Sequence, residues 1–302
     1  MGFLYLLEKI RIPGLNELML AVTALGEETA FLVLALIVFW CVDKKRGYLL
    51  MAVGFTGTIL NQMVKLACRI PRPWVLDPEF TIVEAAREAA AGYSFPSGHT
   101  QFAVGTFASL ACTAEKKWMK GLCIAFAVLV PFSRMYLGVH TPADVLAGAA
   151  MALLLVWVLR VAVMDNGQKA MKAVLISMIS LAVAFLMFVE FWTFPEDLDP
   201  HNYESGMKNA YTMMGCLPAV AIVYVVDRKR DFTVDAAWWV QILKAVVGLG
   251  LVLAVKELTR SPLEALLGNQ MAARSARYFL IVITAGVLWP MSFRKLSKIG
   301  RK

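Results

Sequence analysis

Charged residues and histidine are both scarce in this 302-residue chain. Asp, Glu, Lys and Arg make up 17% of the residues, and the only histidines stand at positions 99, 140 and 201. Hydrophobic residues reach 59% and the mean hydropathy is +0.65, which is too apolar for a soluble domain of this length. The shortage of charge therefore excludes a soluble protein, and the shortage of histidine makes each histidine a residue that needs an explanation.

Cysteine pairs and a recognisable leader are also missing. The five cysteines stand at positions 41, 68, 112, 123 and 216. They form no pair motif and no metal-ligand spacing, so we expect free thiols. The N-terminus lacks a basic start, and Glu8, Lys9 and Arg11 interrupt its apolar stretch, which is not typical of a signal peptide. We expect residues 1–28 to form an interfacial amphipathic segment, broken at Pro13-Gly14.

Long apolar runs are abundant instead. A helix needs about 20 apolar residues to cross a bilayer, and nine runs approach that length. The spans are predicted at 29–42, 47–67, 100–114, 121–137, 143–163, 173–192, 209–226, 237–255 and 277–293. The sequence thus predicts an all-α fold, a polytopic membrane helical bundle.

Basic residues gather in alternate connections between these runs. The clusters lie at 44–46, 116–120, 169–172, 228–230 and 294–302. The positive-inside rule places them in the cytoplasm, so we expect the N-terminus outside and the C-terminus inside a cell membrane. The net charge of +8 then reports topology and indicates no nucleic-acid partner.

Ionisable residues recur at the opposite ends of the runs, which this topology places on the extracytoplasmic side. They are Lys65, Arg72, His99, Arg134, His140 and Asp144. An ionisable group costs about 2.5–3.5 kcal/mol at the bilayer centre on insertion scales, so six at one depth indicate a function.

Most of these residues also have a simpler interpretation, and His99 or His140 taken alone would more often be a structural residue. Lys65 and Arg72 fit interfacial anchors, and Ser97 fits a helix N-cap. Thr141 and Asp144 fit the N-cap and N3 positions of a capping box. These interpretations weaken only when the residues are considered together.

Considered together, the residues suit a phosphate group. Arginine matches two phosphate oxygens at once, and Gly98 allows backbone amides at a helix start to approach an anion. A histidine nucleophile oriented by a carboxylate is consistent with His140 and Asp144, and His99 is then available to protonate the leaving oxygen.

Three short stretches carry a family resemblance. Residues 65–73 read KLACRIPRP, residues 96–99 read PSGH, and residues 133–144 read SRMYLGVHTPAD. They match K-x6-R-P, P-S-G-H and S-R-x5-H-x3-D in that order. The chain thus resembles the type-2 phosphatidic acid phosphatase family of integral membrane lipid phosphatases and diphosphatases, whose histidine mechanism is related to that of vanadium haloperoxidases.

The resemblance implies roles for individual residues. His140 would be the nucleophile, Asp144 its partner and His99 the general acid. The phosphoryl group would be bound by Lys65, Arg72, Ser97, Gly98 and Arg134. It implies hydrolysis of a lipid-linked phosphate through a phosphohistidine, with no metal and no cofactor.

The resemblance also implies a domain organisation. A six-helix phosphatase core is expected at 29–192, followed at 193–302 by an acidic outer loop and about three additional transmembrane helices. Asp197, Asp199 and His201 in that loop are either a metal site or, as we expect, part of a solvated loop.

Three function classes remain open at this point. A phosphatase of phosphatidic acid, phosphatidylglycerol phosphate or a polyprenyl diphosphate agrees best with the intact motifs. A lipid phosphotransferase would use the same phosphohistidine with another acceptor. A transporter or a non-catalytic scaffold is the third class, because intramembrane charges also line transport pathways. The only partners expected from the sequence are the lipid phosphate and the membrane lipids.

Overall fold

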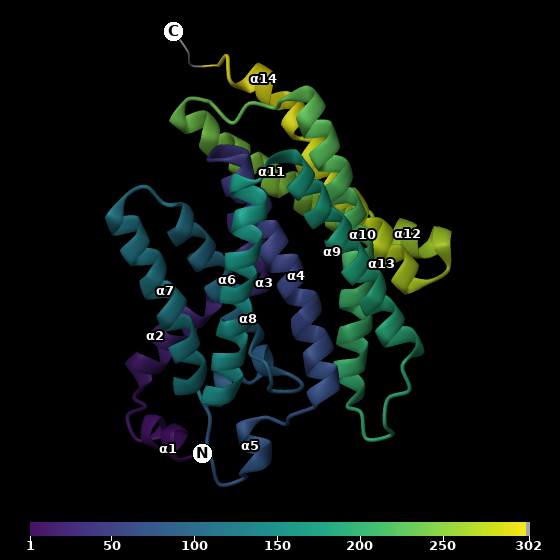
Figure 1. Ribbon diagram of the computed structural model, residues 1–302. Helices are drawn as coiled ribbons and strands as arrows, with labels where there is room; N and C mark the ends of the chain where they lie inside the picture. The colour runs from purple at the N-terminus through teal and green to yellow at the C-terminus, as the bar shows by residue number, and fades with distance from the viewer. Residues whose placement is uncertain (300–302) are drawn as a thin grey trace. The chain divides into compact units, whose positions relative to one another are not determined.

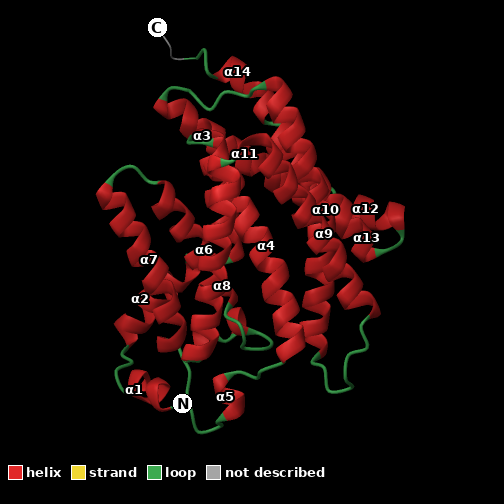
Figure 2. Ribbon diagram, in the orientation of Figure 1, coloured by secondary structure: helices red, strands yellow, loops and turns green. Residues whose placement is uncertain are grey.

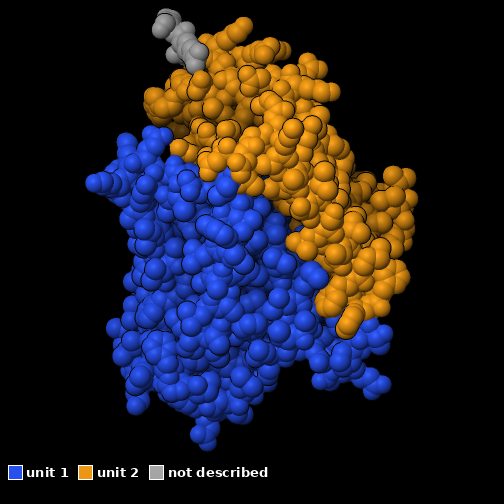
Figure 3. All heavy atoms as spheres, viewed as in Figure 1, with its two compact units in different colours: residues 1–32, 49–161, 193–206 blue, residues 33–48, 162–192, 207–302 orange. Residues whose placement is uncertain are grey.

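The computed structural model describes residues 1–299, and helices account for nearly all of the regular structure (Figure 2). No strand occurs within the described part of the chain. The chain divides into two compact units (Figure 3). Unit 1 comprises Met1–Leu32, Leu49–Val161 and Thr193–Gly206, and unit 2 comprises Val33–Tyr48, Ala162–Trp192 and the chain from Met207 onward. The predicted all-α polytopic bundle is confirmed.

Unit 1 holds the helices that carry the three sequence motifs (Figure 1). Its helices are α1 (Gly2–Glu8), α2 (Pro13–Ala24), most of α4 (Lys44–Cys68), α5 (Pro73–Leu76), α6 (Gly98–Thr113), α7 (Lys117–Tyr136) and α8 (Pro142–Arg160). α6 packs against both α7 and α8, and α1 and α2 pack against α7. Gly148 permits the close approach of α8 to α6, because a Cβ at this position would stand 2.7 Å from the Ser97 carbonyl oxygen.

Unit 2 holds most of α3 (Glu28–Cys41), the first turn of α4 and the C-terminal helices. These helices are α9 (Gly167–Phe191), most of α10 (Pro200–Arg230), α11 (Trp238–Leu258), α12 (Arg260–Leu267), α13 (Gln270–Ile283) and α14 (Phe293–Leu296). α11, α12 and α13 pack against one another.

Seven of the nine predicted spans coincide with helical segments that are long and apolar enough to cross a membrane. The other two predicted spans coincide with α3 and α6, which have 14 and 16 residues and are shorter than a typical span. α2 and α3 together would suffice as one span, but they meet at a bend of 51°. The described chain is therefore a multi-pass membrane protein, with seven helical segments that could each cross a membrane, or up to eight if α2 and α3 form one bent span.

The N-terminal helices contribute to the core of unit 1. The break near Pro13-Gly14 separates α1 from α2, because Pro13 occupies the first turn of α2. Met19 of α2 belongs to a buried cluster with Tyr136 and Val139, at the end of α7 and just before His140. Arg11 secures the same region, since its Nε donates a hydrogen bond to the Tyr136 carbonyl oxygen over 2.8 Å. The N-terminal segment thus supports the turn that precedes His140.

Candidate active site

All eight predicted site residues lie in unit 1. Lys65 stands on the last turn of α4, and Arg72 directly precedes α5. Ser97 is the N-cap of α6, where its side chain accepts a hydrogen bond from the Thr100 amide, and Gly98 and His99 open the helix. Arg134 lies near the end of α7, His140 in the following turn and Asp144 in the first turn of α8. The predicted N-cap role of Ser97 is confirmed.

His140 is almost fully buried and in contact with Arg72. The Arg72 Nη1 donates a hydrogen bond to the His140 Nε2 over 2.8 Å. An acceptor nitrogen carries no proton, so this contact requires a neutral ring that is protonated on Nδ1. Burial, together with the positive charges of Arg72, Arg134 and Lys65, lowers the pKa of His140 well below its ordinary value. The ring therefore presents an unprotonated Nε2, which a nucleophile needs.

Asp144 stands beside the Nδ1 side of the same ring. Its Oδ2 lies 3.5 Å from the His140 Nδ1 and accepts hydrogen bonds from the Thr141 amide over 2.7 Å and from the Ser94 hydroxyl over 2.5 Å. The Asp144 amide donates in return to the Thr141 Oγ1, so the predicted capping box is confirmed. The carboxylate that caps α8 is thus also the carboxylate nearest His140, and the two interpretations of Asp144 are compatible.

The backbone of residues 91–93 fixes two of the predicted cations. The Arg72 guanidinium donates to the carbonyl oxygens of Gly92 over 2.8 Å and Ala91 over 3.1 Å. The Lys65 Nζ donates to the Tyr93 carbonyl oxygen over 2.9 Å. We call residues 91–94 the site strap. The site strap thereby holds together Lys65 at the end of α4, which lies 28 positions before Tyr93, and Arg72, which lies 20 positions before Gly92.

Arg134, the third predicted cation, has buried nitrogen donors that make no hydrogen bond. Its side chain is fully buried, and its Nη1 donates to the Thr23 Oγ1 over 2.9 Å. Its Nε and Nη2 are buried and have no hydrogen-bond partner, and the same holds for the Nε2 of His99 and the Nδ2 of Asn61. A buried cation with unused donors is costly unless an anion accepts from it. The donor set therefore suits a phosphoryl group.

A cavity of about 530 Å³ opens beside the start of α6. Gly98, His99 and Phe102 line it, together with residues 26–29 at the bend between α2 and α3 and residues 85, 88 and 89 of the connection between α5 and α6. A Cβ on Gly98 would have the Asn61 Oδ1, 3.8 Å away, as its nearest neighbour. The glycine thus leaves open space in front of the first turn of α6, where a bound group can approach the backbone.

Three contacts in this region are beyond what the sequence motifs predict. Ser94 lies two residues before Pro96, but nothing in a single serine indicates a bond to a carboxylate fifty positions away. Thr23 belongs to a helix without a motif, and the strap acts through carbonyl oxygens that every residue possesses. Only tertiary structure identifies them.

The acidic loop contributes structure to unit 1. The Asp197 carboxylate lies 2.9 Å from the Arg69 guanidinium, and the Asp199 carboxylate accepts from the Asn202 side chain over 2.8 Å. His201 is exposed. No group of three or more His, Cys, Asp or Glu side chains suited to a metal occurs within residues 1–299.

Comparisons with known proteins agree with this geometry. Residues 45–168 match the family described as PAP2 superfamily, and residues 211–301 match the PAP2 superfamily phosphatase transmembrane extension. Phosphatidylglycerophosphatase B of Bacillus subtilis is 32% identical over 166 residues, which are 50% of this chain and 76% of that protein. The undecaprenyl-diphosphatase of Sulfolobus acidocaldarius is 34% identical over 140 residues, which are 46% of this chain and 66% of the relative.

A more distant match is human sphingosine-1-phosphate phosphatase 2, which is 29% identical over 139 residues, covering 44% of this chain and 34% of the human protein. No solved structure gives a significant match. The relatives are phosphatases and diphosphatases by name, and residues 45–168, which match the family, include all three motifs. The chain therefore belongs to the PAP2 superfamily and is a multi-pass membrane hydrolase of the lipid phosphatase type.

Proposed function

We propose that this protein hydrolyses a lipid phosphate monoester or diphosphate through a phosphohistidine formed on the Nε2 of His140. The observation that carries the proposal is the contact of that nitrogen with Arg72, which requires an unprotonated Nε2 beside a buried cation. Phosphoryl transfer spreads negative charge over three equatorial oxygens, so fixed cations and amides stabilise its transition state. Lys65, Arg72 and Arg134 supply the cations.

In the first step the His140 Nε2 attacks phosphorus while the bond from phosphorus to the leaving oxygen breaks. His99, protonated in the complex beside the phosphate dianion, gives that proton to the leaving oxygen and is left as a neutral imidazole. Its position at the cavity wall suits this role because the leaving group needs open space. The Arg72 Nη1, which donates to Nε2 in the free enzyme, would transfer that hydrogen bond to a phosphoryl oxygen. The nitrogen–phosphorus bond replaces the oxygen–phosphorus bond, and the lipid leaves protonated.

In the second step water attacks the phosphohistidine and gives its proton to His99. The nitrogen–phosphorus bond breaks, inorganic phosphate leaves, and His140 is again neutral. The carboxylate of Asp144 keeps the ring proton on Nδ1 throughout, and the hydroxyl of Ser94 holds that carboxylate. Every step uses groups of unit 1 and water.

The substrate class follows from the relatives and the site together. The named relatives act on a phosphatidylglycerol phosphate, on undecaprenyl diphosphate and on sphingosine 1-phosphate, which share only a phosphate group joined to a lipid. We propose phosphatidic acid, phosphatidylglycerol phosphate and polyprenyl diphosphate as the compounds to test first. We also propose that the site faces the extracytoplasmic side, since the basic clusters at 44–46, 116–120 and 228–230 favour the cytoplasm.

Purified protein in detergent, assayed for phosphate release against these lipids, tests the proposal. We expect release from at least one of them by wild type, an acid-labile phosphoprotein after rapid quenching, and neither result with His140→Ala. Activity retained in folded His140→Ala would overturn the phosphohistidine, and no release from any lipid in the panel would overturn the substrate class.

A further inference from the structure

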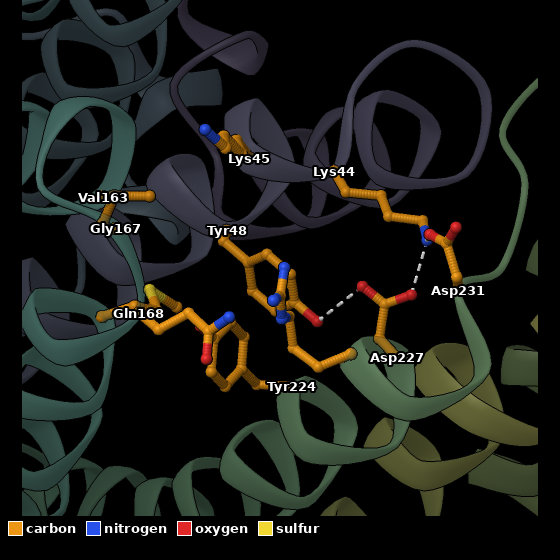
Figure 4. Close-up of a pocket in the computed structure, with 11 residues that line it drawn as sticks. Lys44, Lys45, Tyr48, Val163, Gly167, Gln168, Tyr224, Asp227 and Asp231 are labelled. Atoms are coloured by element: carbon orange, nitrogen blue, oxygen red, sulfur yellow. Dashed lines mark hydrogen bonds and ion pairs between the residues drawn. The ribbon is translucent and has the colours of Figure 1, made fainter.

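A second cavity, of about 500 Å³, lies entirely within unit 2 and contains none of the motif residues. It is bounded by the first turn of α4, the junction of α8 and α9, and the last turns of α10 (Figure 4). The side chains that carry the argument are Lys44, Lys45, Tyr48, Asp227, Arg228 and Asp231. Helical segments long enough to cross a membrane begin at Lys44 and Gly167 and end at Arg230, so the cavity lies at the depth of a membrane surface.

The carboxylates of this cavity already have a partner. Figure 4 shows Lys44 beside both aspartates, with its Nζ 2.6 Å from the buried Asp227 and 3.8 Å from Asp231. The Tyr48 hydroxyl also donates to Asp227, over 3.4 Å. The Asp231 side chain is 98% exposed, so water screens its charge.

Two cations of the cavity have no such partner. Lys45 and Arg228 form no ion pair with any residue that the structure describes, and both line the cavity from its exposed side. The lining has three cationic side chains, Lys44, Lys45 and Arg228, and two anionic side chains, Asp227 and Asp231. Its net charge is therefore +1.

The start of α9 adds a second feature that favours an anion. Gly167 and Gln168 line the cavity, and Gly167 has a φ of +69°, which lets the chain turn after the π-helical residues Val161–Asp165. Asn166 makes no side-chain cap bond, and the first turn of α9 holds no acidic residue. Amides at an uncapped helix start and the helix dipole both attract negative charge.

The remaining wall is apolar. Val163 and Met171 line it, and the rings of Tyr48 and Tyr224 meet edge to face with centroids 5.6 Å apart. The cavity thus combines cationic side chains with an apolar wall at the depth of the membrane surface, which suits an amphiphile with an anionic headgroup. Basic pockets at the ends of membrane helices bind phospholipid headgroups in this way.

We propose that this cavity binds the phosphodiester headgroup of an anionic phospholipid. Lys45, Arg228 and the first amides of α9 hold the phosphate, and Met171 with the two tyrosines contacts the adjoining chain. The single charge of a phosphodiester equals the net charge of the lining, whereas a monoester carries more charge than the lining offsets. This site is separate from the catalytic residues, so phosphate release does not depend on it.

The test is thermal unfolding of the purified full-length protein in a nonionic detergent. Dioleoylphosphatidylglycerol is added to the micelles in one arm, dioleoylphosphatidylcholine in a second, and inorganic phosphate in a third. Lys45→Gln/Arg228→Gln removes the two cations, and Lys172→Gln/Lys229→Gln removes equal charge from exposed positions of α9 and α10 outside the cavity.

We expect phosphatidylglycerol to raise the melting temperature of wild type and of the control by roughly 3 °C, and that of the cavity variant by less than about 1 °C. The cavity variant should still release phosphate at the wild-type rate, which shows that it is folded. If it does not fold, Arg228→Gln alone is compared with Lys229→Gln by counting lipids retained in native mass spectrometry. Equal lipid effects on both variants would overturn the site, and an equal rise with inorganic phosphate would overturn the lipid assignment.

Discussion

Ser94 and Asp144, fifty positions apart, are joined by a hydrogen bond of 2.5 Å from the serine hydroxyl to the Oδ2 of the carboxylate. Both side chains are buried, and the Ser94 Oγ also lies 3.4 Å from the Nδ1 of His140. Asp144 is therefore held from two directions, by Ser94 of the site strap and by the Thr141 amide of its own helix. A carboxylate fixed in this way can determine which nitrogen of His140 carries the proton.

Mutations distinguish the two roles of Asp144, which are to cap α8 and to orient the ring of His140. Asp144→Asn keeps the shape but can favour the wrong tautomer of His140, and we expect a loss of at least about 10²-fold in kcat with near-normal folding. Ser94→Ala removes one of the two donors and should lower kcat about tenfold. Steady-state kinetics and thermal unfolding of the purified variants check both values.

Thr141→Ala is the matched control for these variants. It removes the cap hydroxyl but leaves the Thr141 amide that donates to Asp144, so it should cost about 0.5–2 kcal/mol of stability and keep the rate within about tenfold of wild type. Equal, small rate losses in the Asp144 and Thr141 variants would assign Asp144 to capping alone.

Arg134→Lys should lower kcat/KM by about 10²-fold or more. Lysine provides a point charge in place of the planar donor fork, whose Nε and Nη2 are the unused donors of the buried site. Arg160→Lys, at the exposed end of α8, makes the same substitution outside the site and should leave kcat/KM unchanged. Similar kinetics of the two variants would remove Arg134 from the phosphate site.

The buried imidazole of His140 should make the protein less stable in acid. Its pKa is lowered by burial and by neighbouring cations, so below about pH 6.5 the unfolded chain takes up a proton that the folded site excludes. Its contribution to stability is therefore complete above that pH and declines as the pH falls. The melting temperature of His140→Gln in phosphate-free buffer should drop less than that of wild type between about pH 7.5 and pH 5. Parallel curves would contradict this expectation.

Excess EDTA should leave phosphate release unchanged, and vanadate should inhibit it. The candidate site binds phosphate through cations and amides, and five-coordinate vanadate resembles the phosphoryl transition state that these groups stabilise. The measurement is the initial rate with each compound. Activity lost to EDTA and restored by zinc or magnesium would point instead to a metal mechanism.

Sidedness is tested by thiol labelling of intact cells. In a variant without the native cysteines, Glu79→Cys in the connection between α5 and α6 should react with a membrane-impermeant reagent, and Lys117→Cys should not. Both positions are exposed, so access depends on the side of the membrane. The reverse pattern would place the candidate site in the cytoplasm.

How much of this site the sequence predicts depends on how far apart in the chain the interacting residues lie. The spacing from His140 to Asp144 and the capping box at Thr141 are local in the chain, so sequence patterns predict them. The contact of Thr23 with Arg134 joins residues 111 positions apart, and no local pattern encodes it. The same limit applies to the predicted spans: apolar runs indicated α3 and α6, but these helices end after 14 and 16 residues, and hydropathy alone does not predict where they end.

The site strap also limits how far the chain can be truncated from its C-terminus without disturbing the candidate site. The Tyr93 amide donates to the Asn202 side chain over 2.9 Å, and a Cβ on Gly92, whose φ is +74°, would collide with the same Asn202 oxygen. A chain truncated after residue 192 would keep every motif residue yet lose this support for the carbonyl oxygens that hold Lys65 and Arg72. We therefore expect a chain truncated after residue 192 to be less active than the full chain, even though it keeps the last helix of the expected catalytic core.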